Sequence, residues 1–138
     1  EQLEQDQLAE DRFKTALAKN PNDPFTLNYL GYWWADDGRN LEEAIKLIEQ
    51  AVRLRPRSGY FVDSLGWVHF KLGNYDLAVA FLEKATILEP IDAVITGHLG
   101  DAYWETGRYA EARFKWQYAL SITTEDDLKA ELTAKLKQ

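Results

Sequence analysis

The segment Leu65-Gly66-Trp67-Val68-His69 recurs along the chain and decides the fold. It aligns with Leu30-Gly31-Tyr32-Trp33-Trp34 upstream and with Leu99-Gly100-Asp101-Ala102-Tyr103 downstream. The glycine of the segment steps forward by 35 residues and then by 34. A regular period of this length is the sequence signature of a stacked-repeat architecture.

A second set of residues follows each of these segments at a constant spacing. It consists of a turn glycine, two alanines seven residues apart with a large apolar residue between them, and a proline. The copies are Gly38, Ala44, Ile48, Ala51 and Pro56; Gly73, Ala78, Leu82, Ala85 and Pro90; and Gly107, Ala112, Trp116 and Ala119, with Thr124 in place of the proline. Upstream, Ala9, Phe13, Ala16 and Pro21 repeat this second half alone. We therefore expect the chain to begin in mid-repeat, which agrees with its lack of methionine.

Each unit is predicted to be two helices joined by a tight turn. The expected first helices are Phe25–Asp37, Tyr60–Leu72 and Ala93–Thr106, and the expected second helices are Leu41–Leu54, Tyr75–Leu88 and Tyr109–Ile122. The turn glycines supply the positive φ that ends the first helix. The glycine of each recurring segment lies inside a helix, at a cost of about 1 kcal/mol. We expect tight packing against the partner helix to offset that cost.

This pattern resembles the tetratricopeptide repeat over about residues 8–122. The resemblance implies an all-α fold, a right-handed superhelical solenoid of antiparallel helix pairs with about three and a half repeats. We expect a single domain, 1–138, made of the second helix of a truncated repeat (1–23), three repeats (24–58, 59–92 and 93–124) and a C-terminal capping helix (125–138). The capping helix is predicted from a capping-box pattern at Thr124–Asp127, followed by an apolar stripe of Leu128, Leu132 and Leu136.

The composition excludes several classes of function. The chain has 138 residues, a net charge of −7 and a pI near 4.8, which argues against nucleic-acid binding. The longest apolar run, Tyr29–Ala35, is far shorter than the roughly 18 residues of a membrane helix, so no direct membrane insertion is expected. Without cysteine there is no disulfide, thiolate nucleophile or cysteine-type metal site. No catalytic motif is present, so we expect neither an enzyme nor a cofactor.

The chain contains two histidines, and both have an ordinary structural interpretation. His69 occupies the position of Trp34 and Tyr103 in the other copies, so it is expected to pack inside its repeat. His98 precedes Asp101 and Glu105 by one and two helical turns, a stripe that could bind a metal ion. A solvated polar face is far commoner for such a stripe, and no metal site is predicted.

The first helices of successive repeats line the inner curve of such an array. We expect a peptide-binding groove there, made of Tyr29, Tyr32, Tyr60, Asp63, Trp67, Phe70, His98, Asp101, Trp104 and Glu105. Within it an aromatic row is expected to be exposed to solvent: Tyr32, Trp67, Phe70 and Trp104. The alternative for any one of these residues is packing between neighbouring repeats. Exposed aromatic patches are typical of interaction sites, and the flanking carboxylates favour an apolar or basic protein or peptide over an acidic one.

The family resemblance carries one exclusion and one suggestion. Tetratricopeptide proteins that hold the acidic C-terminal tail of heat-shock chaperones use a clamp of Lys, Arg and Asn. That function is not expected here, because the matching positions carry no Lys or Arg: they are Asn28, Tyr32, Ser64, Val94 and His98.

Residues 60–122 also look like the C-terminal repeats of long bacterial tetratricopeptide proteins, through Asp63–Trp67, His98–Trp104, Glu111–Arg113 and Trp116. Some of those are similar to envelope lipoproteins that act as adaptors for periplasmic processing proteases. The resemblance implies a bacterial protein of the cytoplasm or periplasm, with the envelope slightly favoured.

Two functions remain open from the sequence. The first is a scaffold or adaptor whose groove holds a peptide segment of a partner protein, and it predicts that the aromatic row is exposed. The second is a structural solenoid segment that self-associates through its terminal helices, and it predicts that the groove is filled by the chain's own tail or by a neighbouring copy. The exposed face of the helix at Glu1–Lys19 is the candidate surface for a homodimer.

Overall fold

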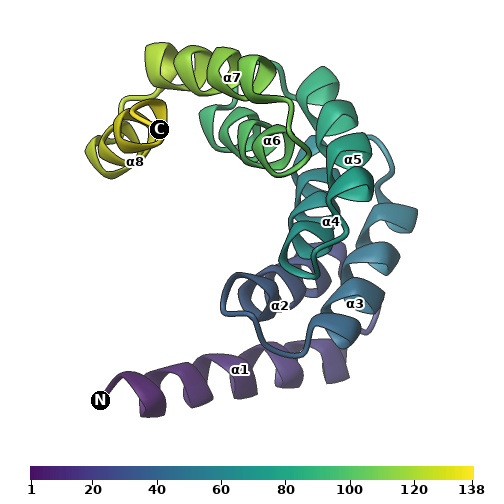
Figure 1. The fold of residues 1–138 in the computed structure, drawn as a ribbon. Helices are drawn as coiled ribbons and strands as arrows, with labels where there is room; N and C mark the ends of the chain where they lie inside the picture. The colour runs from purple at the N-terminus through teal and green to yellow at the C-terminus, as the bar shows by residue number, and fades with distance from the viewer.

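The computed structural model describes all residues from Glu1 to Gln138 and contains eight helices and no strands (Figure 1). The helices are α1 (Gln2–Lys19), α2 (Pro24–Asp36), α3 (Leu41–Leu54), α4 (Gly59–Lys71), α5 (Tyr75–Leu88), α6 (Ala93–Glu105), α7 (Tyr109–Ile122) and α8 (Asp126–Leu136). The expected all-α fold is confirmed. The six helices predicted for the three full repeats agree with these bounds to within one residue at each end.

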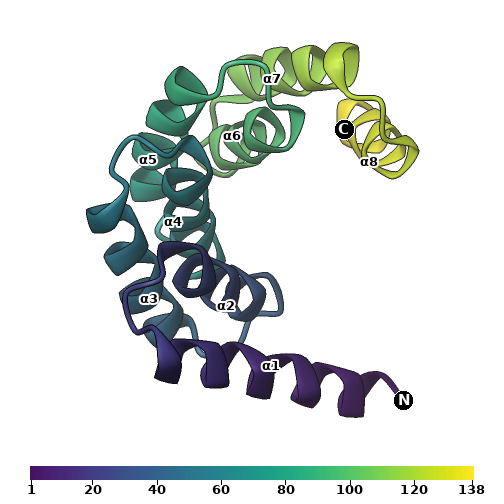
Figure 2. The ribbon, with the colours of Figure 1, turned by 180° about the vertical axis from the view of Figure 1, so that it is seen from behind.

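The helices are arranged in an open arc (Figures 1 and 2). α2, α4 and α6 lie along its inner side, and each packs against the helix that follows it, α3, α5 or α7, on the outer side. α1 extends along one end of the arc, whereas α8 turns back into the arc at the other end. The result is a solenoid of antiparallel helix pairs with α2, α4 and α6 on its concave side.

The turns inside the repeats have the predicted geometry. Gly38, Gly73 and Gly107 have φ of 69°, 83° and 82°, the left-handed conformation that glycine adopts at no steric cost. The first turn is one residue longer than the others. Asn40 takes up that residue with a φ of 50°, and α3 begins immediately after it. Asparagine is one of the few side chains that tolerate this region, so the insertion leaves the helix pair intact.

The inner helices begin at side-chain caps. Asp23, Ser58 and Asp92 each accept a hydrogen bond from a backbone N–H in the first turn of the helix that follows, which stabilises a helix by about 1 kcal/mol. These caps, together with the turn glycines, set both ends of every inner helix from local sequence alone.

The glycines inside the inner helices lie against the large apolar residue of the partner helix. A Cβ atom would lie 2.6 Å from Ile48 Cγ1 at Gly31, 2.7 Å from Leu82 Cγ at Gly66 and 2.6 Å from Trp116 Cδ1 at Gly100. Real Cβ atoms do not approach other heavy atoms this closely. The prediction that close helix approach requires these glycines is therefore confirmed.

The core runs between the inner and outer helices. Its largest fully buried side chains are Trp116, Leu30, Ile48, Leu82, Ile95, Leu99, Leu132, Val62 and Val68. The paired alanines of each outer helix are fully buried as well. None of the eight helices combines the length and the apolar character needed to cross a bilayer.

The terminal helix α8 covers the last repeat, as its leucine stripe predicts. Leu132 is fully buried, and Leu128 and Leu136 pack against the same cluster. The expected capping box is wrong. The N-cap of α8 is Glu125, which makes no side-chain cap, and its N–H donates to Thr123 Oγ1 at 3.1 Å. Because the helix begins at Asp126, the hydroxyl of Thr124 lies one position too early to cap it.

Candidate partner-binding groove

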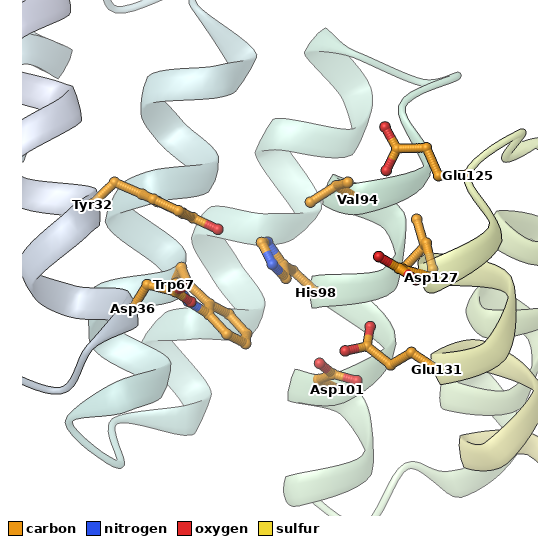
Figure 3. Close-up of a pocket in the computed structure, with 10 residues that line it drawn as sticks. Tyr32, Asp36, Trp67, Val94, His98, Asp101, Glu125, Asp127 and Glu131 are labelled. Carbon is orange, nitrogen blue, oxygen red and sulfur yellow. The ribbon is translucent and has the colours of Figure 1, made fainter. Parts of the chain in front are cut away.

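The inner face of the arc contains two adjoining hollows, which together we call the groove. The apolar hollow, about 320 Å³, lies between α2 and α4 and is lined by Phe25, Asn28, Tyr29, Tyr32, Ser58, Tyr60, Phe61, Asp63, Ser64 and Val94. The acidic hollow, about 330 Å³, is bounded by α8 on its far side and is lined by Tyr32, Asp36, Trp67, Val94, His98, Asp101, Glu125, Asp127, Leu128 and Glu131 (Figure 3). The two hollows share Tyr32 and Val94.

Three aromatic side chains of the apolar hollow are more than half exposed: Phe25 at 54%, Tyr29 at 59% and Tyr60 at 54%. Phe25 packs edge-to-face on Phe61, with ring centroids 5.5 Å apart. Tyr29 and Tyr60 belong to the groove residues expected from the sequence. The helical spacing also places Phe25 on the same stripe of α2 as Tyr29, although Phe25 was not included in the expected groove.

Tyr32 stands between the two hollows and reaches across the space toward His98 (Figure 3). Burial raises the pKa of its hydroxyl, and the nearby carboxylates of Asp36, Asp63 and Glu131 raise it further. The phenol therefore stays neutral and keeps a proton that it can donate to a ligand.

The expected exposure of Trp67 is wrong. Only 9% of the residue is accessible, because its ring is stacked on Phe70 with centroids 4.9 Å apart and on His98 with centroids 4.0 Å apart. Its Nε1 donates to Asp36 Oδ1 at 3.3 Å. The next inner helix, α6, brings His98 over the ring, so Trp67 is a packing residue between repeats and presents only part of its surface to the acidic hollow.

Phe70 and Trp104 are also half-buried and do not continue an exposed row. Phe70 packs edge-to-face on Tyr75, with centroids 5.3 Å apart. Trp104 packs on Tyr109 at 4.4 Å and on Trp116 at 5.4 Å. Both line a third hollow, of about 250 Å³, beside Glu105 and the end of α8. The aromatic row is therefore wrong as an exposed surface: Trp67 packs between repeats, Phe70 and Trp104 pack onto their own repeats, and the exposed aromatic residues of the groove line the apolar hollow.

His98 pairs with Asp63 of the preceding repeat. The Nδ1 atom of His98 lies 2.8 Å from Asp63 Oδ1, and both side chains are close to nine-tenths buried. Burial alone would lower the pKa of His98, but the charge and hydrogen bond of Asp63, with the charge of Asp101, outweigh it and raise the pKa. Asp63 of the preceding repeat thus has the larger effect on His98, Asp101 of the predicted stripe adds to it, and Glu105 is not among the causes of the shift. No three histidine or carboxylate side chains converge in a geometry that could hold a metal ion.

The raised pKa of His98 predicts a pH-dependent contribution to stability. Protonation of His98 stabilises the folded state fully below its ordinary pKa of about 6.5, and this contribution is lost as the pH rises through the higher folded-state value. His98→Asn keeps a nitrogen donor for Asp63 but cannot be protonated. We expect urea unfolding to show the wild type gaining stability over His98→Asn as the pH is lowered.

His69 provides the matched control for this measurement. It stacks on Phe81 at 5.5 Å, and its burial lowers its pKa. A lowered pKa favours the neutral ring in the folded state, so His69→Asn should show the opposite trend, with the wild type losing its advantage as the pH falls. The same trend in both variants would contradict the assignment of the pH effect to the His98–Asp63 pair.

Asp101 is held by the terminal helix. Lys135 Nζ lies 2.8 and 2.9 Å from the two carboxylate oxygens, and Trp116 Nε1 donates to Oδ1 at 3.0 Å. The contact with Lys135 was missed from the sequence, as were Glu125, Asp127 and Glu131 on the same wall. These residues enter the site only because α8 turns into the arc, and no repeat period predicts that direction.

The charge of the acidic hollow is one-sided. Its ten lining residues include five carboxylates and neither a lysine nor an arginine. In Figure 3 the carboxylates of Glu125, Asp127 and Glu131 stand on the α8 side, and Asp36 stands on the opposite wall. The groove therefore joins an apolar, aromatic end to an acidic end.

The tetratricopeptide repeat family model matches residues 35–93 and 64–126. The TPR repeat-containing protein PA4667 of Pseudomonas aeruginosa is 34% identical over 85 residues, which is 62% of this chain and 14% of that protein. The TPR repeat-containing protein MJ1428 of Methanocaldococcus jannaschii is 34% identical over 94 residues, which is 67% of this chain and 16% of that protein. The chain thus spans only a small part of the length of these relatives.

Solved structures of other proteins have the same arrangement of helices. The tetratricopeptide protein TTC0263 of Thermus thermophilus superimposes with a TM-score of 0.80 at 27% identity, covering 94% of this chain and 72% of that one. MamA gives 0.72 at 24% identity, with 94% and 83% covered. The type III secretion translocator chaperone SycD of Yersinia enterocolitica gives 0.75 at 19% identity, with 86% and 90% covered. Because MamA and SycD are less than 25% identical to this chain, their similarity shows the fold alone. The family match agrees with the repeat in the sequence and with the helix pairs in the structure. The chain belongs to the tetratricopeptide repeat family.

Proposed function

We propose that this chain is a binding module that holds a segment of a partner protein in the groove. The tetratricopeptide fold is in general a scaffold for protein interactions. The observation that carries the proposal for this groove is the exposure of Phe25, Tyr29 and Tyr60 around the apolar hollow. Concave, apolar surfaces with exposed aromatic side chains are preferred sites of partner binding, and tyrosine is enriched among the residues that dominate binding energy.

The alternative is self-association through the terminal helices. α1 has no buried residue, and its Leu3 and Leu8 are 75% and 51% exposed. A second copy could cover these side chains and form a homodimer. Under this alternative the groove plays no part in assembly, and its variants leave the oligomeric state unchanged.

The test replaces the exposed tyrosines and leaves the core intact. Tyr29→Ser/Tyr60→Ser removes two aromatic side chains from the apolar hollow, whereas variants of Trp67, Phe70 or Trp104 would disturb packing. The matched control is Ile87→Ser/Ile91→Ser, which removes two apolar side chains that are 79% and 78% exposed outside the groove. Peptides selected from a random phage library on the wild-type chain are then measured by fluorescence anisotropy. We expect the tyrosine variant to bind them at least about tenfold more weakly and the isoleucine variant to bind them unchanged.

Circular dichroism must show that both variants remain helical. Binding that is equally strong in the tyrosine variant contradicts the groove. A sedimentation measurement on Leu3→Ser/Leu8→Ser addresses the alternative directly: a wild-type dimer that this variant abolishes supports self-association through α1, and an unchanged monomer rejects it.

A further inference from the structure

We propose that the groove recognises a basic segment, with a lysine or arginine side chain in the acidic hollow and a neighbouring apolar side chain in the apolar hollow. This inference rests on the proposed function and names the chemistry of the partner. It is carried by the charges that face each other across the acidic hollow and by an unpartnered amide in the apolar one.

The carboxylates of the acidic hollow are not all compensated by the chain itself. Lys135 neutralises Asp101, and its Nζ also lies 3.6 Å from Glu131. Asp36 on α2 and Asp127 on α8 have no cationic partner within 4 Å, and they lie on opposite walls of the hollow (Figure 3). Like charges that line one hollow repel each other, and a cation that enters the hollow is attracted to all of them.

This charge pattern arises from the tertiary fold and not from local sequence. Asp36 and Asp127 lie far apart in the chain and face each other across the hollow only because α8 turns into the arc. Asp127 belongs to the first turn of α8, where the helix dipole favours a negative charge. Asp36 accepts a single hydrogen bond, from Trp67 Nε1, which leaves its second carboxylate oxygen free for a ligand.

Asn28 gives an independent indication of a bound peptide. The residue is 7% exposed and lines the apolar hollow, yet its Oδ1 has no hydrogen-bond partner in the protein. A buried polar atom without a partner is unfavourable. Because Asn28 lines the apolar hollow, a main-chain N–H of a segment bound there is a candidate donor for this oxygen. The missing group is a donor, as are the ammonium and guanidinium groups that suit the adjoining hollow.

The spacing of the two hollows suits one continuous segment. They share Tyr32 and Val94, so neighbouring side chains of one peptide can reach both. Trp67 offers no free ring face to the ligand, because Phe70 and His98 stack on it and Lys71 Nζ already lies 5.1 Å from a ring centroid. The carboxylates thus supply the attraction, and Tyr32 supplies a neutral donor between the sites. A second copy of this chain, with a net charge of −7, does not match this surface.

The test uses synthetic fluorescent peptide pools on the whole chain. Each pool fixes a phenylalanine or leucine next to one variable position that is arginine, glutamine or glutamate, with mixed serine and alanine elsewhere. We expect the arginine pool to bind roughly tenfold more tightly than the glutamine pool, and the glutamate pool to bind least. The preference for arginine should shrink as salt is added, because these charges are open to solvent.

Charge-removing variants locate the effect. Asp36→Asn/Asp127→Asn removes the two facing charges, and the first of these substitutions retains an amide oxygen that can accept from Trp67. The control, Glu42→Gln/Asp76→Asn, removes two charges from the first turns of the outer helices α3 and α5. We expect the groove variant to lose the preference for arginine and the control to keep it.

The outcomes separate this inference from the proposed function. Equal binding of the arginine and glutamine pools, still weakened by Tyr29→Ser/Tyr60→Ser, overturns the basic-segment inference and leaves the groove in place. An arginine preference that survives Asp36→Asn/Asp127→Asn also overturns it, since the attraction is then to the acidic protein as a whole. If no pool binds in a way that depends on Tyr29 and Tyr60, the proposed function fails and the inference fails with it.

Discussion

Replacement of Trp116 by alanine is expected to lower the free energy of unfolding by about 4 kcal/mol. The side chain is 1% exposed, and it is the largest of the fully buried side chains. It fills the space that Gly100 leaves on α6, and its Nε1 donates to Asp101 at 3.0 Å. Alanine therefore leaves a large cavity between α6 and α7 and removes a hydrogen bond to a charged group, and both losses act in the same direction.

Two further variants separate these contributions. Trp116→Phe retains most of the apolar volume but loses the hydrogen bond, and we expect a smaller loss of about 2 kcal/mol. Phe114→Ala removes an aromatic side chain that is 66% exposed on the same helix, and we expect a change within about 0.5 kcal/mol. Urea unfolding followed by circular dichroism measures all three. A loss of less than about 1 kcal/mol for Trp116→Ala would contradict this account of the core.

The same substitution connects the core to the groove. Trp116 and Leu132 belong to one buried cluster, and α8 is held on the last repeat through that cluster and through Lys135. In a repeat array each unit is stabilised mainly by its neighbours. A cavity at Trp116 therefore weakens the packing of α8 as well as that of α7. Because α8 contributes Glu125, Asp127 and Glu131 to the acidic hollow, that wall is destabilised too.

The helices and their close packing were predictable because corresponding positions in the repeats can be compared with one another. The positions of Gly31, Gly66 and Gly100 are interpretable only together, and the contact of each with Ile48, Leu82 or Trp116 follows from the constant spacing. Helix ends are similarly local, since they depend on a capping side chain or on a glycine with positive φ.

The side chains of the groove were harder to predict, because their exposure depends on the next repeat along the arc. The sequence placed Trp67 correctly on the inner face of α4. The relative position of α4 and α6, which the sequence does not give, brings the ring centroids of Trp67 and His98 to 4.0 Å from each other. The direction of α8 has no second copy for comparison, so the contact of Lys135 with Asp101 had no signal in the repeat pattern. Helical spacing places Phe25 on the stripe that contains Tyr29, but spacing alone does not show which side chains of that stripe stay exposed.

The second large effect is a contrast between two glycines of α6, Gly97 and Gly100. A Cβ atom at Gly97 would lie 3.7 Å from Leu132 Cδ2, an ordinary contact distance, and Gly97 does not have a positive φ. Alanine is therefore expected to raise the free energy of unfolding by about 0.5–1 kcal/mol, because it improves helix propensity and restricts the unfolded chain. The new methyl group also touches α8.

Gly100→Ala is expected to lower the free energy of unfolding by about 2 kcal/mol, although it brings the same gain in propensity. Its Cβ would lie 2.6 Å from both Cδ1 and Nε1 of Trp116 and 3.2 Å from the backbone oxygen of Ala112. The indole is enclosed and cannot withdraw, so α6 and α7 must separate. Since the two substitutions are chemically identical and lie three residues apart in one helix, their difference of about 3 kcal/mol in urea unfolding isolates packing from propensity. Changes of the same sign in both variants would show that close approach of the helices is not what requires glycine in the recurring Leu-Gly segment.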